Sequence, residues 1–201
     1  GLLSCQWVFE MDEIYVSVDI ESDGPIPGDN SMLSIGSAAY AESGLLISTF
    51  SANIMPLQAA VQNPVTMDFW SKQPKAWEEL QKERLAPGIV MHQYLEWLQT
   101  LSTDPDTTLV FVAYPAVFDF AYVHWYLIHF VGIDPFGFSA LDLKTYAMAT
   151  LNLKFSQTYK SNMPKEWLNR NHPPHVALAD AIEQGEMFFA IRQAIQKSSE
   201  E

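Results

Sequence analysis

Two carboxylates interrupt the end of an apolar strand near the start of the chain. In the stretch YVSVDIESDG, residues 15–24, apolar positions predict a β-strand over 14–20, and Asp19 and Glu21 lie at its end. Residues two apart in a strand point to the same face, so both carboxylates are aimed in one direction. A pair of this kind is more often a solvated strand end, so by itself it is a weak signal for chemistry.

Three later residues have the types and positions that a metal-assisted reaction needs. Asp119 follows an apolar strand at 108–114 and lies in the first turn of a predicted helix, where an anion is favoured. His175 and Asp180 lie in HVALAD, at the start of the last predicted helix. Carboxylates within about 4–6 Å repel one another, and a divalent cation that prefers oxygen ligands removes that penalty.

Such a group of side chains suits phosphodiester hydrolysis. Two Mg²⁺ or Mn²⁺ ions roughly 3.5–4 Å apart can hold the attacking and leaving oxygens of the displacement. A histidine with a pKa near neutrality can take the proton from the attacking water. The residue types therefore predict a two-metal hydrolytic site.

The elements that must position these residues follow one order along the chain: three strands, helices, a buried strand and further helices. A tight ESG turn joins the second and third strands and predicts an antiparallel meander. The buried fourth strand and the helices around it suit one central mixed sheet with helices on both faces. The predicted strands are 14–20, 31–41, 44–54 and 108–114, the predicted helices are 63–73, 74–83, 86–101, 116–132, 140–151 and 176–197, and 152–175 is rich in loops.

Composition narrows the class of protein. The 201 residues fit one domain, 11–201, preceded by an extension or an expression-derived segment at 1–10. One cysteine, Cys5, excludes an intrachain disulfide framework and favours a reducing, cytoplasmic location. We find no signal peptide and no apolar run long enough to cross a membrane. A net charge of −13 argues against a broad surface that neutralises duplex phosphates, but metal ions could still grip a short strand.

The motifs together resemble those of a known superfamily. D-x-E at 19–21, FD at 118–119 and H-x-x-x-x-D at 175–180 match, in order, the three motifs of the DEDDh branch of the DnaQ-like 3′–5′ exonucleases. D-x-E alone is very weak, whereas three ordered motifs across almost the whole chain are specific. More loosely, the segments 67–73 and 111–125 resemble a ribonuclease AS or phage-exonuclease-like subgroup. One departure lies before the second-motif aspartate: many relatives have a segment there that contains glycine or asparagine, whereas this chain has AYPAVFD, with a proline.

The resemblance implies a fold and a set of roles. The fold would be ribonuclease H-like, a five-stranded mixed sheet flanked by helices, with a short fifth strand near 136–143. Asp19, Glu21, Asp119 and Asp180 would hold two Mg²⁺ or Mn²⁺ ions, and His175 would be the general base. The substrate would be the 3′ end of single-stranded RNA or DNA, released as nucleoside 5′-monophosphates. Relatives of this size are often homodimers, so a second copy is one further partner to expect.

Substrate contacts are predicted in two regions. Phe69 and Trp70 read equally well as core residues or as a stacking platform for bases, and Ser22 follows the D-x-E pair. The segment 143–175 carries five basic residues and one acid, and it reads either as a solvated loop or as a flap that contacts phosphates. Its basic residues are Lys144, Lys154, Lys160, Lys165 and Arg170, of which we assign the last three to substrate binding.

Three alternatives stay open at the level of sequence. His172 is the one competitor for general base, but its spacing to Asp180 does not fit the motif. A catalytically inactive module with the same fold could bind nucleic acid or protein, although it would have no need for all five residues. A simple divalent-cation binding protein is disfavoured because no calcium loop of the D-x-[DN]-x-[DN]-G type occurs.

Overall fold

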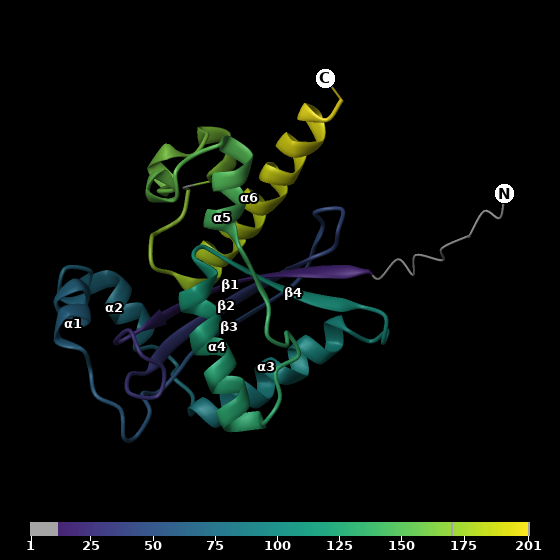
Figure 1. The fold of residues 1–201 in the computed structure, drawn as a ribbon. Helices are drawn as coiled ribbons and strands as arrows, with labels where there is room; N and C mark the ends of the chain where they lie inside the picture. Colours follow the sequence, from purple (N-terminus) through teal and green to yellow (C-terminus); the bar gives the residue numbers. More distant parts are fainter. Residues whose placement is uncertain (1–11, 170, 201) are drawn as a thin grey trace.

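A single five-stranded mixed sheet forms the centre of the molecule, in the strand order β3-β2-β1-β4-β5 (Figure 1). The computed structural model describes residues 12–169 and 171–200, so the predicted extension 1–10 with Cys5, and Arg170, lie outside the described residues. The first three strands form the predicted antiparallel meander, and the fourth and fifth run parallel to β1. Their bounds are β1 Glu13–Ser22, β2 Met32–Tyr40, β3 Leu46–Asn53, β4 Thr108–Ala113 and β5 Ala140–Asp142.

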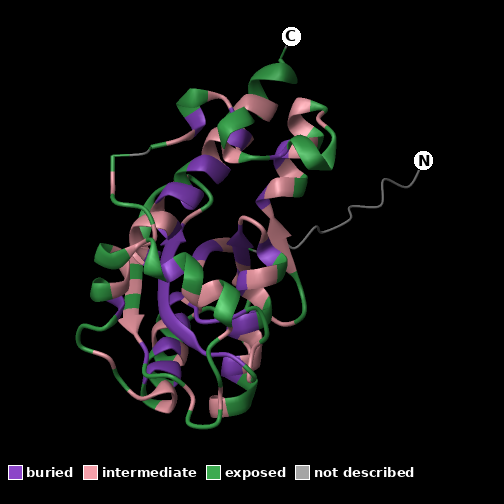
Figure 2. Cartoon of the chain, turned by 90° about the vertical axis from the view of Figure 1, so that its left-hand side faces the viewer, coloured by how far each residue is buried: buried purple, intermediate pink, exposed green. Residues whose placement is uncertain are grey.

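Helices cover both faces of this sheet, which confirms the predicted ribonuclease H-like fold class. Helices α3 and α4 lie on one face and α5 and α6 on the other, whereas α1 and α2 pack beyond one end of the strands (Figure 1). Buried residues concentrate in the central strands and on the helix faces turned toward them (Figure 2). No helix within the described residues is long and apolar enough to cross a membrane. The helices are α1 Pro64–Ser71, α2 Pro74–Leu80, α3 Pro87–Leu101, α4 Ala116–Val131, α5 Leu143–Leu151 and α6 Ala177–Ser198.

The predicted helix over 140–151 needs a correction at its start. Ala140–Asp142 forms β5, inside the range expected for the fifth strand, and α5 begins at Leu143. The Asp142 carboxylate accepts hydrogen bonds from the Thr145 backbone N–H and hydroxyl, so it caps the helix at this position. The sequence pattern does not change where β5 passes into α5, so it does not mark the boundary between them. The Asp142 cap sets that boundary. The loop-rich segment before α6 holds three short 3₁₀ turns, at Phe155–Gln157, Lys160–Asn162 and Lys165–Trp167.

The alternation along β1 decides which face receives the carboxylates. Val16, Val18 and Ile20 are buried in the core beneath α3 and α4. Ser17 points to the opposite face, where its hydroxyl donates to the Ala181 carbonyl of α6 at 2.6 Å. Because side chains alternate, Asp19 and Glu21 continue on the α6 face of the sheet. The expectation that the two carboxylates share one face follows from this register.

Gly36 allows α6 to approach the sheet beside Asp19. It is the cross-strand partner of Asp19 in the β1–β2 ladder. A Cβ atom added at Gly36 would lie 2.3 Å from the Ala177 carbonyl carbon and the Leu178 nitrogen, which are backbone atoms of the first turn of α6. Only a glycine leaves room for this contact. The first turn of α6, which carries Asp180, is thereby brought to the end of β1.

Candidate active site

One cleft at the ends of β1 and β4 gathers all five residues of the predicted motifs. Its volume is about 590 Å³, and its walls come from β1, the start of α4, the start of α6 and the segment before α6. A larger hollow of 910 Å³ lies between α2 and the Pro173–Pro174 turn but includes none of the four predicted carboxylates. The charged and titratable residues that line the cleft are Asp19, Glu21, Asp119, Asp180 and His175, with Lys160, His172 and Glu183.

The four carboxylates converge from three elements. Oxygen atoms of Asp19, Glu21 and Asp180 all lie within 4.8 Å of one another. Asp119 is 4% exposed, and its Oδ1 accepts a hydrogen bond of 2.9 Å from the Ile20 backbone N–H of β1. This bond fixes the first turn of α4 against the strand that carries Asp19 and Glu21. The structure therefore brings together the carboxylates that the sequence predicts.

Burial and mutual repulsion disfavour the ionised forms of this group. Burial, followed by the charges of Glu21 and Asp119, raises the pKa of Asp19 well above its ordinary value. Burial and the charge of Asp180 raise the pKa of Glu21 to about 8. Burial raises the pKa of Asp119 to about 7, against the opposing effect of its hydrogen bond from Ile20, and burial also raises the pKa of Asp180. A bound cation would therefore stabilise the ionised carboxylates of the cleft.

The carboxylates fit a divalent cation for a second reason. Asp19 Oδ2 is buried and has no hydrogen-bond partner among the described residues. A buried polar atom without a partner costs roughly 1–3 kcal/mol, and the nearby groups include the carboxylates of Glu21 and Asp180, whose oxygens lie within 4.8 Å of an Asp19 oxygen. Hard divalent ions such as Mg²⁺ and Mn²⁺ take oxygen ligands of this kind. The donor set suits them, since each side chain offers oxygen and none offers sulfur.

His175 lies at the mouth of the cleft, directly before α6. Its backbone has a φ of 60°, which is unusual for a residue other than glycine. Its Nδ1 is 3.9 Å from Glu21 Oε1, and its ring meets the ring of Phe69 edge-on at 5.0 Å. The imidazole is one third exposed. It therefore lies beside the carboxylates and in contact with solvent, as a residue that accepts a proton from water must.

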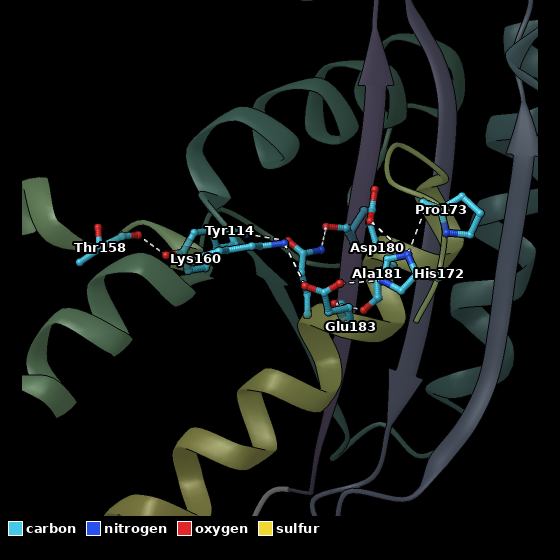
Figure 3. Close-up of polar contacts among 11 residues, drawn as sticks. Tyr114, Thr158, Lys160, His172, Pro173, Asp180, Ala181 and Glu183 are labelled. Carbon is cyan, nitrogen blue, oxygen red and sulfur yellow. Dashed lines mark hydrogen bonds and ion pairs between the residues drawn. The ribbon is translucent and has the colours of Figure 1, made fainter. Parts of the chain in front are cut away.

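His172, the competing histidine, is engaged in a different way (Figure 3). Its Nε2 is 2.6 Å from Glu183 Oε2, and its Nδ1 lies 3.7 Å from Asp180 Oδ1. Burial lowers the pKa of His172, but hydrogen bonds with the Pro173 carbonyl and Glu183 and the nearby negative charges outweigh it, so the pKa is raised. His172 is thus held by a carboxylate at hydrogen-bond distance, whereas the His175 Nδ1 stays 3.9 Å from the Glu21 carboxylate.

Glu183 is a cleft residue that the sequence reasoning did not find. It is 6% exposed, and besides His172 it contacts Lys160, whose Nζ lies 3.5 Å from Glu183 Oε1 (Figure 3). It lies three residues after Asp180 on α6, and this spacing puts both side chains on one helix face. This three-residue spacing from Asp180 is the sequence signal that could have identified Glu183. Glu183 therefore holds both ends of the 160–172 segment at the cleft.

The other predicted substrate contacts divide into cleft and non-cleft residues. Trp70 is buried and its Nε1 donates to the Ser22 carbonyl at 2.9 Å, so it belongs to the core, whereas Phe69 is 40% exposed. Ser22 is buried, and its hydroxyl donates to the Gly24 carbonyl at 2.7 Å. Lys160 lines the cleft, but Lys165 is exposed and does not line it. Arg170 lies outside the described residues.

The fold and the site define a class: ribonuclease H-like proteins with an acidic cleft at the ends of the first and fourth strands. Solved structures of the same fold include the nuclease domain of 3′hExo, a DEDDh family member bound to rAMP (TM-score 0.66, 10% identity, 94% of each chain covered). Another is Escherichia coli exonuclease I in complex with a dA16 oligonucleotide (TM-score 0.64, 15% identity), of which this chain spans 42% while 92% of this chain is covered.

A curated relative gives the family. The 3′–5′ DNA exonuclease Cap18 of Escherichia coli is 34% identical over 185 residues, which cover 92% of this chain and 95% of Cap18. No protein-family model matches the chain. The chain belongs to the 3′–5′ exonuclease family that includes Cap18, and the predicted assignment to the DnaQ-like DEDDh exonucleases is confirmed. The finer likeness to ribonuclease AS stays a prediction.

Proposed function

We propose that this 3′–5′ exonuclease is metal-dependent and removes nucleoside 5′-monophosphates from the 3′ end of single-stranded nucleic acid. One observation carries the proposal: oxygens of Asp19, Glu21 and Asp180 lie within 4.8 Å of one another, and Asp19 Oδ2 is buried with no hydrogen-bond partner among the described residues. These three carboxylates and Asp119 would hold two divalent ions, Mg²⁺ or Mn²⁺. When bound, the ions would supply charge stabilisation for the attacking and leaving oxygens.

The histidine proposed as general base is His175. It lies beside Glu21, is partly exposed, and has its ring braced edge-on by Phe69. His172 is less suited to the role because its Nε2 is already bonded to Glu183. A positioned general base typically contributes about 10²–10⁴-fold to the rate. We therefore assign proton removal from water to His175 and a binding role to the Glu183–His172 pair.

The terminal nucleoside has a separate place beside the cleft. A hollow of about 210 Å³ adjoins it and is lined by Glu21, Ser22, Phe69, Trp70 and Phe118, among others. Phe69 offers an exposed ring there, on which a base could stack. Ser22 and Trp70 would support this hollow as its wall, and Lys160 would contact the phosphate next to the carboxylates.

Single-stranded DNA is the substrate we favour. The supporting observation is the 34% identity to a relative named as a DNA exonuclease. Discrimination against RNA would depend on contacts to the 2′-hydroxyl. The predictions of a homodimer and of a single domain over 11–201 stand beside this proposal as expectations.

The test is digestion of matched 5′-labelled DNA and RNA single strands with Mg²⁺, Mn²⁺ or EDTA. We expect shortening from the 3′ end with either metal, release of 5′-mononucleotides, faster loss of DNA, and no reaction in EDTA. Asp19→Asn and Asp180→Asn should abolish the reaction. Turnover at the wild-type rate by either variant would overturn the metal site.

A second comparison separates the two histidines. His175→Ala should lower kcat by about 10²–10⁴, and His172→Ala should lower it less. The acid limb of the pH–rate profile should disappear only in His175→Ala. A larger loss of kcat from His172→Ala would reverse the assignment.

A further inference from the structure

Next to the cleft, one lysine lies among three aromatic rings. Lys144 Nζ is 5.6 Å from the ring centroid of Tyr114, 5.4 Å from that of Phe155 and 5.4 Å from that of Tyr159. Lys160 Nζ lies 5.7 Å from the Tyr114 ring on the cleft side. The residues come from the end of β4, from α5 and from the 3₁₀ segment after it. We call Tyr114, Lys144, Phe155 and Tyr159 the aromatic platform.

The platform is exposed in a way that a packed core would not be. Phe155 is 56% and Tyr159 is 63% exposed. Lys144 forms no salt bridge within the described residues, although the chain carries a net charge of −13. An ammonium group without a carboxylate partner, beside two uncovered rings, offers both a charge and stacking faces to a ligand.

The platform is continuous with the cleft and held in place. Tyr114 lines the cleft, and its hydroxyl donates to the carbonyl of Thr158, a fully buried residue between Phe155 and Tyr159 (Figure 3). Lys160, the next residue after Tyr159, reaches back to Glu183 in the cleft. A ligand that extends out of the cleft past Tyr114 would therefore meet Lys160 first and then the exposed rings and Lys144.

We propose that the aromatic platform binds the nucleotides on the 5′ side of the bond that is cut, with bases stacked on Phe155 and Tyr159 and phosphates near Lys144 and Lys160. This inference depends on the proposed function. In an exonuclease only the terminal nucleotide lies beyond that bond, so the rest of the strand must leave the cleft by another side. Single-strand binding surfaces combine cations with aromatic rings in this way, and stacking tolerates any base. The platform would therefore give affinity for strands without sequence preference.

The test compares a dinucleotide with a strand of about ten nucleotides, the latter within the range of single-strand site sizes. For the wild type, KM should be lower for the longer strand. In the double variant Phe155→Ala and Tyr159→Ala, the ratio of the dinucleotide KM to the long-strand KM should fall by about tenfold or more, because each lost stacking contact is worth at least a severalfold change in affinity. The pair Phe155→Tyr and Tyr159→Phe, which keeps both rings, should restore the ratio.

A matched control removes an exposed ring elsewhere. Phe138 is 93% exposed and lies against His124 rather than against a lysine, so Phe138→Ala should leave the ratio unchanged. An unchanged ratio in the double variant would overturn the proposal. If the ratio were unchanged because KM rose equally for both substrates, the segment would only support the active site.

Failure of the proposed function can be distinguished from failure of the platform. If the wild type degraded no strand, binding of a fluorescent ten-nucleotide DNA in EDTA, followed by anisotropy, would still report on the platform. There the double variant should bind at least about tenfold more weakly than Phe138→Ala. Equal affinities for these two variants would overturn the platform.

Discussion

The four carboxylates of the cleft make the metal-free protein sensitive to pH. Folding raises the pKa of Glu21 from an ordinary 4.5 to about 8 and that of Asp119 from 3.8 to about 7. Between the unfolded and the folded pKa of each residue, the folded state therefore binds more protons than the unfolded state. The free energy of unfolding must fall as pH rises through this range. Bound Mg²⁺ favours the ionised carboxylates and should reverse this trend.

The corresponding measurement is thermal unfolding in EDTA and in Mg²⁺. In EDTA, Tm should fall steadily from pH 5 to pH 8, and Mg²⁺ should raise Tm most at pH 8. Asp19→Asn should raise Tm in EDTA, because the amide is neutral without a bound proton or cation. A Tm that is independent of pH in EDTA would contradict the raised pKa values.

Glu183 provides a prediction about positioning. Its carboxylate contacts His172 at 2.6 Å and Lys160 at 3.5 Å, and hydrogen bonds to charged groups contribute about 1.5–3 kcal/mol. In Glu183→Gln the 160–172 segment should be held less firmly, and KM for oligonucleotides should rise by about tenfold or more, with a smaller change in kcat. Glu96→Gln, at an exposed site on α3 away from the 160–172 segment, is the matched control. A loss of kcat as large as that of Asp19→Asn would instead identify Glu183 as a metal ligand.

At the scale of elements, the contact between α6 and the sheet decides the site. In Gly36→Ala the new Cβ would clash with the backbone at Ala177 and Leu178, at 2.3 Å, so the first turn of α6 must move. We expect a loss of about 1–3 kcal/mol in unfolding free energy and a drop in kcat, because Asp180 moves away from Asp19. In Gly88→Ala the Cβ would meet only Phe130 at 3.5 Å, so stability and kcat should not fall. Wild-type kcat in Gly36→Ala would contradict this account.

Gln184 links strands β1 and β4 beyond the point where their backbone pairing ends. The β1–β4 pairing stops at Ser17 and Val112, and beyond it the strands need another partner for their backbone groups. Gln184 Nε2 donates to the Val18 carbonyl at 3.1 Å, and its Oε1 accepts from the Tyr114 N–H at 3.0 Å. One side chain of α6 therefore bridges the two strand ends. Gln184 and Tyr114 both line the cleft, so this bridge forms part of its wall.

At the scale of the whole molecule, charge opposes the substrate except near the cleft. A net charge of −13 repels a polyanion over long range, whereas Lys144 and Lys160 attract it locally. Two phosphate contacts predict a slope of about 1.4 for log KM against log salt concentration, at about 0.7 per contact for single strands. In the double variant Lys144→Gln and Lys160→Gln the slope should vanish or change sign, since salt then only screens repulsion. The exposed Lys165 is the control, and a slope that fell equally in Lys165→Gln would point to general charge effects.

The sequence by itself determined what local periodicity and order can determine. The two-residue period of β1 placed Asp19 and Glu21 on one face, and the ordered motifs placed Asp119, His175 and Asp180 at element ends. Apolar patterns and turn residues predicted four strands and the helices, and the resemblance added the short fifth strand near its actual position. These features depend on neighbours in the chain, which is why they could be read without coordinates.

Only the tertiary structure decided which residues meet from distant segments. Glu183 looks like any polar residue on a helix until the 160–172 segment folds onto it, and Lys144 has no visible partner until Tyr114, Phe155 and Tyr159 surround it. Phe69 and Trp70 are adjacent and similar, yet packing buries one and exposes the other. Burial and long-range contacts are properties of the folded chain, and they alone fix which of several equivalent side chains faces the cleft.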